Sequence, residues 1–209
     1  MINVFFGDSI TEGSNCDISF ADYFNPVSIT ENNGISGTTI GEYSIYPVDG
    51  NSLLSVYNKP GGRITAADRI FLEYGTNDVS AIMCGFTSLQ TVIVSFIKAL
   101  DGIKQINPRA KITFLAISLD HDIIYKHSEL QCNYLKNDYF KGYDFNFPVN
   151  LCTSYYQQLI QAVSKRIQVI PMIDDITFFD ENAECISNDN LHPNRKGHYI
   201  IAENIKKYI

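Results

Sequence analysis

The sequence predicts an α/β fold in which helices cover both faces of a central parallel sheet. Short apolar runs alternate with longer stretches of helical periodicity along the chain. The runs are continuous, as in strands that are buried on both faces, and such strands belong to parallel sheets. The 209 residues, 45% of them hydrophobic, are enough for one core. We therefore expect a single domain over residues 1–209.

Five apolar runs are expected to form the strands: residues 2–6, 27–30, 69–74, 111–117 and 168–172. The first and third of these runs end at a glycine. The run at 111–117 (KITFLAI) is the strongest, and the run at 27–30 is the weakest. These lengths are typical of strands.

Three stretches are expected to be helices. Residues 89–106 carry apolar side chains at helical spacing and end before Pro108. A second helix is expected at 155–167. In the third, at 195–209, three isoleucines lie four residues apart on one face. In open parallel sheets the ligand site lies beyond the carboxyl ends of the strands, so the loops at that edge are where chemistry is expected.

One long irregular segment, at about 118–150, is predicted to be an insertion. Connections of this length are usually functional loops or disordered. Seven Tyr and Phe residues within it favour an ordered insertion. It could form a small satellite core or a wall of the substrate cleft, and in the second case Tyr143 is a candidate substrate contact.

Charge and hydropathy exclude several classes of protein. The net charge is −7 (16 Lys and Arg against 23 Asp and Glu), which argues against nucleic-acid binding. No apolar run approaches the ~20 residues of a membrane span, so no membrane insertion is expected. No basic segment precedes the first apolar run, which favours a cytoplasmic location; phage association or leaderless export stays open.

The five cysteines are scattered, and none has the spacing of a zinc site. Free thiols in a reducing compartment are therefore expected. No metal and no cofactor is expected either.

Gly7, Asp8 and Ser9 follow the first apolar run directly. This places Ser9 on a turn between a strand and a helix. The start of a helix offers free backbone N–H groups and a positive dipole, which would stabilise a developing oxyanion. Alternatively, Asp8 or Ser9 only caps the helix. These residues alone leave both interpretations open.

Asp189 and His192 lie near the other end of the chain. A serine nucleophile needs a base, and the base needs a carboxylate to orient it. Two residues three apart can hold that geometry locally. The G-x-S-x-G elbow of α/β-hydrolases is absent, because Thr11 stands in place of its second glycine. The remaining histidines are expected to be structural or surface residues: His121, His127 and His198.

Two further glycine-containing loops, at 32–39 and 74–78, follow the second and third strands. The Gly37 N–H group, the Asn77 amide and the Ser9 N–H group could converge on an oxyanion. Ordinary turn chemistry explains each loop when it is taken alone.

Together the four segments resemble the SGNH (GDSL-type) hydrolase family. The corresponding blocks are GDSIT, NNGISGTT, GTND and DNLH, in family order. The resemblance implies a three-layer flavodoxin-like sandwich with a five-stranded sheet of order 2-1-3-4-5. It implies a triad of Ser9, His192 and Asp189 and an oxyanion hole made by Ser9, Gly37 and Asn77. The candidate substrate contacts beside them are Asp8, Thr76, Asp78 and Tyr143.

The expected activity is ester hydrolysis through an acyl-enzyme, with O-acetyl groups on a carbohydrate as the preferred substrate. The insertion rich in Tyr, Phe and Asn favours a carbohydrate. Lysophospholipase or thioesterase activity, acyl transfer between glycans and a non-catalytic glycan-binding module stay open as alternatives. The expected partner is a glycan or small-molecule ester, and the sequence does not indicate the oligomeric state.

Overall fold

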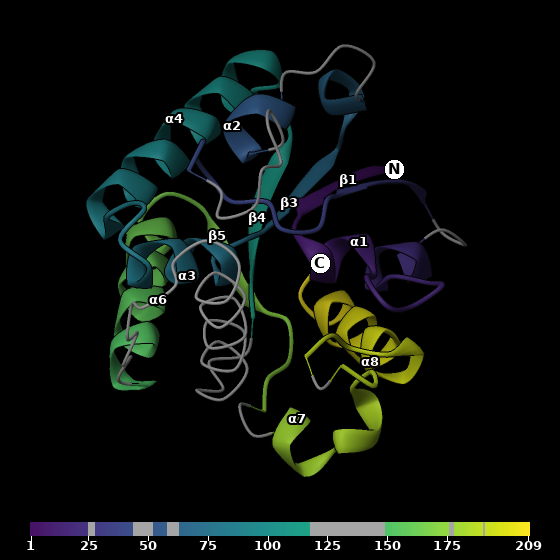
Figure 1. Cartoon of the computed structure of the whole chain (residues 1–209). Helices are drawn as coiled ribbons and strands as arrows, with labels where there is room; N and C mark the ends of the chain where they lie inside the picture. The colour runs from purple at the N-terminus through teal and green to yellow at the C-terminus, as the bar shows by residue number, and fades with distance from the viewer. Residues whose placement is uncertain (25–27, 44–51, 58–62, 118–148, 176–177, 190) are drawn as a thin grey trace.

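The computed structural model describes residues 1–24, 28–43, 52–57, 63–117, 149–175, 178–189 and 191–209. Its centre is a parallel sheet of five strands in the order β2-β1-β3-β4-β5 (Figure 1). This confirms the predicted fold class and strand order. The strands are β1 (Ile2–Gly7), β2 (Ile29–Gly34), β3 (Arg69–Glu73), β4 (Lys111–Ala116) and β5 (Gln168–Pro171).

The register aligns the carboxyl ends of the three strands that precede the glycine loops. Gly7 at the end of β1 pairs with Gly34 of β2 on one side and with Glu73 of β3 on the other. The chain therefore leaves all three strands at the same level. This alignment brings the loops after β1, β2 and β3 together at one edge of the sheet.

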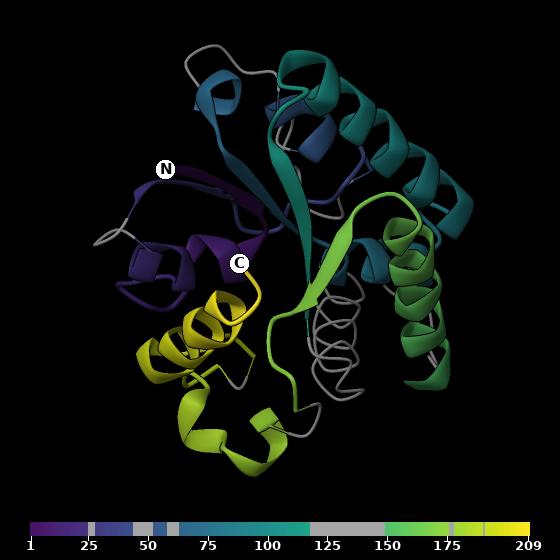
Figure 2. The same cartoon turned by 180° about the vertical axis from the view of Figure 1, so that it is seen from behind.

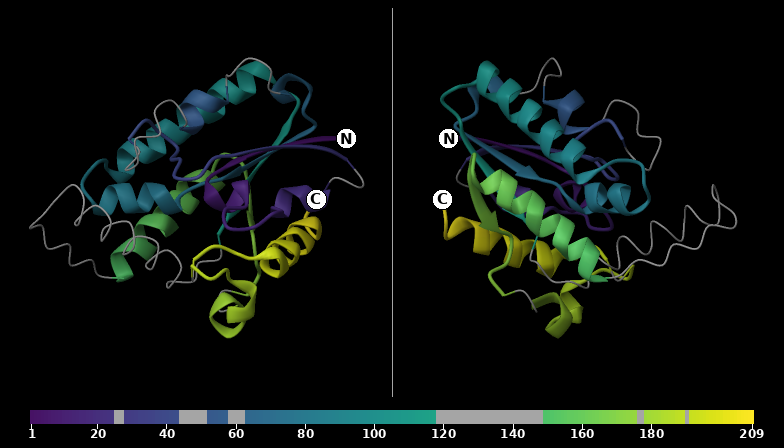
Figure 3. Two further views of the ribbon diagram at one scale, coloured as in Figure 1. Left: turned by 45° about the vertical axis from the view of Figure 1, so that its right-hand side comes forward. Right: turned by 90° about the vertical axis from the view of Figure 1, so that its left-hand side faces the viewer.

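Alternate side chains of the strands build two cores, one on each face of the sheet. Val4 and Phe6 of β1 belong to the core under α2 (Leu53–Val56) and α4 (Leu89–Ile106). Phe5 belongs to the opposite core, where it stacks on Phe71 of β3. Figure 3 shows α4 and α8 (Arg195–Lys206) on opposite sides of the sheet.

The two ends of the chain meet in the second core. The 3₁₀ segment η1 (Phe20–Phe24) packs against α8, although about 175 residues separate them (Figures 1 and 2). The rings of Phe20 and His198 stack there, with their centroids 6.2 Å apart. This packing fixes the C-terminal region next to the segment that follows β1.

The structure corrects several predicted boundaries. Helix α4 has the predicted bounds, but α6 (Val149–Ser164) begins six residues earlier than predicted and takes the last two residues of the predicted insertion. The segment at 74–78 is a loop only at its start, because α3 (Thr76–Met83) begins within it. Gly75, with φ +127°, permits this abrupt change from strand to helix.

The weak strand at 27–30 is also longer than predicted. Strand β2 continues to Gly34 through polar residues at an edge of the sheet, where an apolar pattern is not needed. The short helix α7 (Phe178–Glu181) was not predicted. Residues 118–148, with Tyr143, lie outside the described part of the chain. None of the described helices is long and apolar enough to cross a bilayer.

Candidate active site

Ser9 is the first residue of α1 (Ser9–Glu12), directly beyond the end of β1. Asp8 caps this helix, because its Oδ1 accepts a hydrogen bond of 3.0 Å from the N–H group of Ile10. A Cβ at Gly7 would lie 2.0 Å from Oγ1 of Thr11, so only glycine fits before the turn. Asp8 therefore caps the helix, while the hydroxyl of Ser9 lies 2.8 Å from His192 Nε2.

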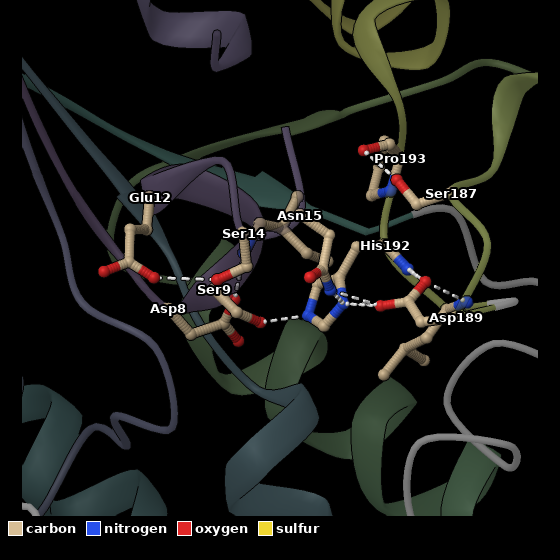
Figure 4. Close-up of polar contacts among 11 residues, drawn as sticks. Asp8, Ser9, Glu12, Ser14, Asn15, Ser187, Asp189, His192 and Pro193 are labelled. Atoms are coloured by element: carbon tan, nitrogen blue, oxygen red, sulfur yellow. Dashed lines mark hydrogen bonds and ion pairs between the residues drawn. The ribbon is translucent and has the colours of Figure 1, made fainter. Parts of the chain in front are cut away.

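Ser9, His192 and Asp189 form one chain of hydrogen bonds, although 183 residues separate the first two (Figure 4). His192 Nε2 lies 2.8 Å from Ser9 Oγ, and His192 Nδ1 lies 2.5 Å from Asp189 Oδ2. These distances are those of a nucleophile beside its base and of a base beside its orienting carboxylate. The structure thus brings together the three residues that the sequence singled out.

A local loop holds Asp189 and His192. Ile186 and Pro193 form an antiparallel bridge, and Ser187 N–H donates to His192 O at 2.8 Å. Oδ1 of Asp189 accepts hydrogen bonds of 3.0 Å from the N–H groups of Leu191 and His192. The spacing of three residues therefore works as predicted, because the carboxylate closes a turn with its own backbone.

The surroundings of Asp189 favour its ionised form. Burial raises the pKa of this carboxyl, but hydrogen bonds from the His192 side chain and from two backbone N–H groups lower it further than burial raises it. The net pKa is below its usual range. An ionised Asp189 can stabilise an imidazolium when His192 takes a proton.

A pair of buried carboxyl groups lies beneath Ser9. Asp8 Oδ2 accepts hydrogen bonds from Thr76 Oγ1 at 2.5 Å and from Asn77 Nδ2 at 3.2 Å. Glu73 Oε2 accepts from Thr11 Oγ1 at 2.8 Å. Burial, and then the charge of Asp8, raise the pKa of Glu73 well above its usual range. Burial and the neighbouring charge of Asp8 therefore both favour the protonated form of Glu73.

Gly37 and Asn77 lie just beyond the ends of the two strands that flank β1. Gly37 lies in the turn after β2 with φ +77°, and Asn77 lies in the first turn of α3. The Asn77 amide donates to Thr38 O at 2.9 Å and to Asp8 at 3.2 Å. Both N–H groups of the amide therefore already have an acceptor. To donate to an oxyanion as well, Asn77 would have to weaken its longer bond, the one to Asp8.

Three of the candidate substrate contacts are buried side chains. Asp8, Thr76 and Asp78 are at most 2% exposed. Asp78 Oδ1 accepts from Ile40 N–H at 2.9 Å and from the Tyr43 hydroxyl at 2.7 Å, and burial raises the pKa of Asp78 to about 7. We therefore expect these side chains to support the loops from beneath rather than to touch a substrate.

His198 is a structural residue, as expected. It is fully buried in α8, and its Nδ1 accepts a hydrogen bond of 3.3 Å from Phe20 N–H. Burial lowers the pKa of His198 to about 4. His121 and His127 lie outside the described residues.

Asn15 was not predicted to belong to the site. Its Nδ2 donates to Asp189 Oδ2 at 2.7 Å and lies 3.4 Å from His192 Nδ1. No sequence motif marks this residue, because its partner lies 174 positions away. Only its place shortly after the GDSIT block could have drawn attention to it.

The described residues also form a small apolar hollow beside this site. Its volume is about 10 Å³, roughly enough for one water molecule. It is lined by residues that flank Ser9 and His192 and by their apolar neighbours: Ile10, Ile117, Met172, Phe179, Leu191, Pro193 and Ile201. Within the part of the chain that is described, no group of three or more His, Cys, Asp or Glu side chains could hold a metal ion.

Residues 5–200 match the model of the GDSL-like lipase/acylhydrolase family. A structure of a member of the lipolytic protein G-D-S-L family from Veillonella parvula DSM 2008 has 20% identity and a TM-score of 0.58, and the match covers 99% of this chain and 97% of that one. A comparison with curated protein sequences gives no match.

Two further structures with the same fold are esterases. One is a family two carbohydrate esterase from Clostridium thermocellum in complex with cellohexaose: identity is 15%, the TM-score is 0.64, and coverage is 100% of this chain and 63% of that one. The other is a two-domain esterase active on acetylated mannans, co-crystallized with mannopentaose: identity is 17%, the TM-score is 0.56, and coverage is 100% and 48%. At these identities the likeness establishes the fold.

Proposed function

Because the chain belongs to the GDSL-like lipase/acylhydrolase family, we propose that it is a serine ester hydrolase with a Ser9–His192–Asp189 triad. The observation that carries this proposal is the uninterrupted chain of hydrogen bonds from Ser9 Oγ through His192 to Asp189. It lies at the carboxyl edge of the sheet, where ligands bind in folds of this class.

The proposed reaction has two stages. Ser9 Oγ attacks the ester carbonyl carbon while its proton passes to His192 Nε2, and Asp189 stabilises the resulting imidazolium. The tetrahedral intermediate collapses when the bond to the alcohol breaks and His192 returns the proton to the leaving oxygen. Water then attacks the acyl-Ser9 ester, its proton goes to His192, and collapse releases the acid and restores Ser9.

The proposed oxyanion hole combines three donors that follow three neighbouring strands. Ser9 is the first residue of α1, so its N–H group has no acceptor within the helix. The Gly37 N–H group and the Asn77 amide come from the neighbouring strand ends. The 3.2 Å bond from Asn77 to Asp8 is the longer of the two that this amide makes, so it is the one that the amide would weaken on donating to an oxyanion.

For the substrate we propose O-acetyl groups on a carbohydrate. The likeness to an esterase active on acetylated mannans and to a carbohydrate esterase that binds cellohexaose supports this choice. A lysophospholipase or thioesterase would need a large apolar channel for a long acyl chain.

A panel of esters tests the substrate proposal. We expect faster hydrolysis of p-nitrophenyl acetate than of p-nitrophenyl octanoate, and release of acetate from acetylated mannan or cellulose oligosaccharides. A strong preference for octanoate would contradict the carbohydrate substrate and favour a lysophospholipase or thioesterase. Acetyl groups that appear on a second sugar instead of free acetate would indicate acyl transfer.

A fluorophosphonate probe tests the enzyme class separately. We expect it to label the protein, and we expect Ser9→Ala to remove both the label and about 10³-fold or more of kcat on p-nitrophenyl acetate. Full turnover by Ser9→Ala would reject the triad. A folded wild-type protein that the probe does not label would indicate a non-catalytic module.

A further inference from the structure

We propose that Asn15 is a positioning residue: its amide ties the Asp189 carboxylate to the segment that carries Ser9 and so keeps His192 aligned with the nucleophile. The proposal rests on the proposed esterase function. The shorter contact of the Asn15 amide is to Asp189 Oδ2 at 2.7 Å, and its distance to His192 Nδ1 is 3.4 Å, so Asn15 acts on the two partners of Ser9 and chiefly through Asp189.

The contacts of Asp189 divide into two groups. The backbone donors at 3.0 Å and the imidazole donor at 2.5 Å all belong to residues 191 and 192, on the loop of Asp189 itself. Asn15 Nδ2, at 2.7 Å from Oδ2, comes from the other end of the chain. Among the described hydrogen bonds of the carboxylate, this is the one that fixes its place relative to α1.

The backbone of this segment is anchored directly to Ser9. The N–H groups of Gly13 and Ser14 both donate to Ser9 O, at 3.0 and 2.9 Å. Asn15 follows with φ +61°, in the left-handed region that asparagine tolerates better than most residues. Figure 4 shows its side chain lying beside the His192 ring and reaching Asp189. The amide therefore spans the two halves of the triad through a short, ordered path.

The backbone conformation at Asn15 decides which variant is informative. Asn15→Gly removes the amide and keeps a residue for which a positive φ is not strained. Asn15→Ala removes the same amide but adds backbone strain, so any excess loss in the alanine variant measures the backbone. Asp17→Asn is the matched control, because Asp17 pairs with Arg195 across the same two segments, is exposed and does not contact the triad.

The first readout is the split between kcat and KM on p-nitrophenyl acetate. A hydrogen bond to a charged group is lost in Asn15→Gly, so we expect kcat to fall about tenfold, with KM unchanged. We expect Asp17→Asn to retain both parameters of the wild type. An unchanged kcat in Asn15→Gly would overturn the proposal.

The second readout is a double-mutant cycle with Asp189→Ala. If Asn15 acts by holding Asp189, then Asn15→Gly causes no further loss of kcat in the Asp189→Ala background. A residue that only stabilises the loop would cost the same factor in both backgrounds. Equal losses in both backgrounds would therefore overturn the proposal.

A third readout does not depend on turnover. The proton that His192 Nδ1 shares with Asp189 is expected as a low-field ¹H NMR resonance, which Asn15→Gly shifts or broadens and Asp17→Asn leaves in place. If the wild type lacks Ser9-dependent hydrolysis, the proposed function fails while this resonance still tests the tether. A resonance unchanged in Asn15→Gly would overturn it.

Discussion

At the scale of single residues, the least expected feature is Glu73, a carboxyl group buried beneath the nucleophile. Burial and then the charge of the neighbouring acid raise the pKa of Glu73 well above its usual range. Burial also raises the pKa of its neighbour Asp8, but Asp8 accepts hydrogen bonds from Ile10, Thr76 and Asn77, which favour its charged form. The pair thus joins α1, which begins with Ser9, to the start of α3, which bears Asn77.

Glu73→Gln tests the protonation state of this pair. The folded state holds the Glu73 proton above pH 4.5, where the unfolded chain releases it, so this group's contribution to stability is lost as pH rises. Glutamine stays neutral at every pH and can still accept the hydrogen bond from Thr11. We expect Glu73→Gln to gain stability relative to the wild type between pH 4.5 and 8 in urea unfolding. A stability difference that is independent of pH would contradict a protonated Glu73.

Asn77→Ala tests the proposed oxyanion donor. We expect kcat on p-nitrophenyl acetate to fall about 10²–10³-fold, as for the loss of one donor at other oxyanion sites. The amide also binds Thr38 O, so a urea unfolding curve must accompany the kinetics. A variant that is folded and retains the kcat of the wild type would remove Asn77 from the oxyanion hole.

The residues that the sequence could identify are those in motifs. Ser9 follows a strand, and Asp189 and His192 lie three apart, so their meeting was predictable. Asn15 and Glu73 were not predictable as members of the site, because their partners at Asp189 and Asp8 are set by tertiary packing. The burial of Asp8 and Asp78 was missed for the same reason: charged residues in a loop normally face water.

At the scale of elements, the passage from β1 to α1 depends on close packing of backbone. Helix α1 lies directly on the ends of β1 and β2. A Cβ at Gly34 would come within 2.2 Å of Glu12 N, and one at Gly7 within 2.8 Å of Glu73 O. No larger side chain leaves room for this turn, which is why the helix can present Ser9 so near the sheet.

Gly7→Ala tests this packing. The added methyl group meets Thr11 and backbone, so we expect a loss of about 3 kcal/mol in the free energy of unfolding. The control is Gly85→Ala, where a Cβ has no neighbour within 4 Å but φ is +76°, and where strain alone costs about 1–2 kcal/mol. Urea unfolding of both variants measures the difference. A smaller loss for Gly7→Ala than for Gly85→Ala would contradict the steric argument.

His198 tests the packing of α8 on η1. Burial holds the pKa of His198 at about 4, below the 6.5 of the unfolded chain. Between these values the unfolded state binds more protons, so this contribution to stability is present above pH 6.5 and is lost as pH falls towards 4. A fall of the pKa from 6.5 to about 4 corresponds to roughly 3 kcal/mol.

We expect His198→Gln, which can still accept from Phe20 N–H, to lose less stability than the wild type between pH 6.5 and pH 4. Thermal unfolding across that range measures the effect. Parallel losses in the two proteins would show that His198 does not cause the acid sensitivity.

The predictability of the elements follows their length and pattern. Helix α4 was predicted to the residue because it is long and amphipathic, begins at the cap Ser88 and ends before Pro108. Helix α3 was missed because its first residues look like a polar loop, and only the positive φ at Gly75 converts them into a helix. The predicted strand at 27–30 ended too early, because edge strands such as β2 tolerate polar residues that hide the apolar pattern.

At the scale of the whole molecule, the fold accounts for how distant residues meet. The parallel register ends three strands at one level, and the packing of α8 on η1 brings the C-terminal loop over that edge. Strand order and sheet direction were predictable from the alternation and the family resemblance. The contact between η1 and α8 was not, because it depends on buried surfaces that no local pattern specifies.

The most direct test of the proposed triad is to trap the acyl-enzyme. The protein is mixed with p-nitrophenyl acetate, quenched in acid within the first turnover, digested and analysed by mass spectrometry. We expect one acetyl group on the peptide that contains Ser9, and we expect its accumulation in His192→Ala to be abolished. The proposed triad would be contradicted if the acetyl group that turns over were on another residue. It would also be contradicted if the ester were hydrolysed at the full rate without acetylation of Ser9.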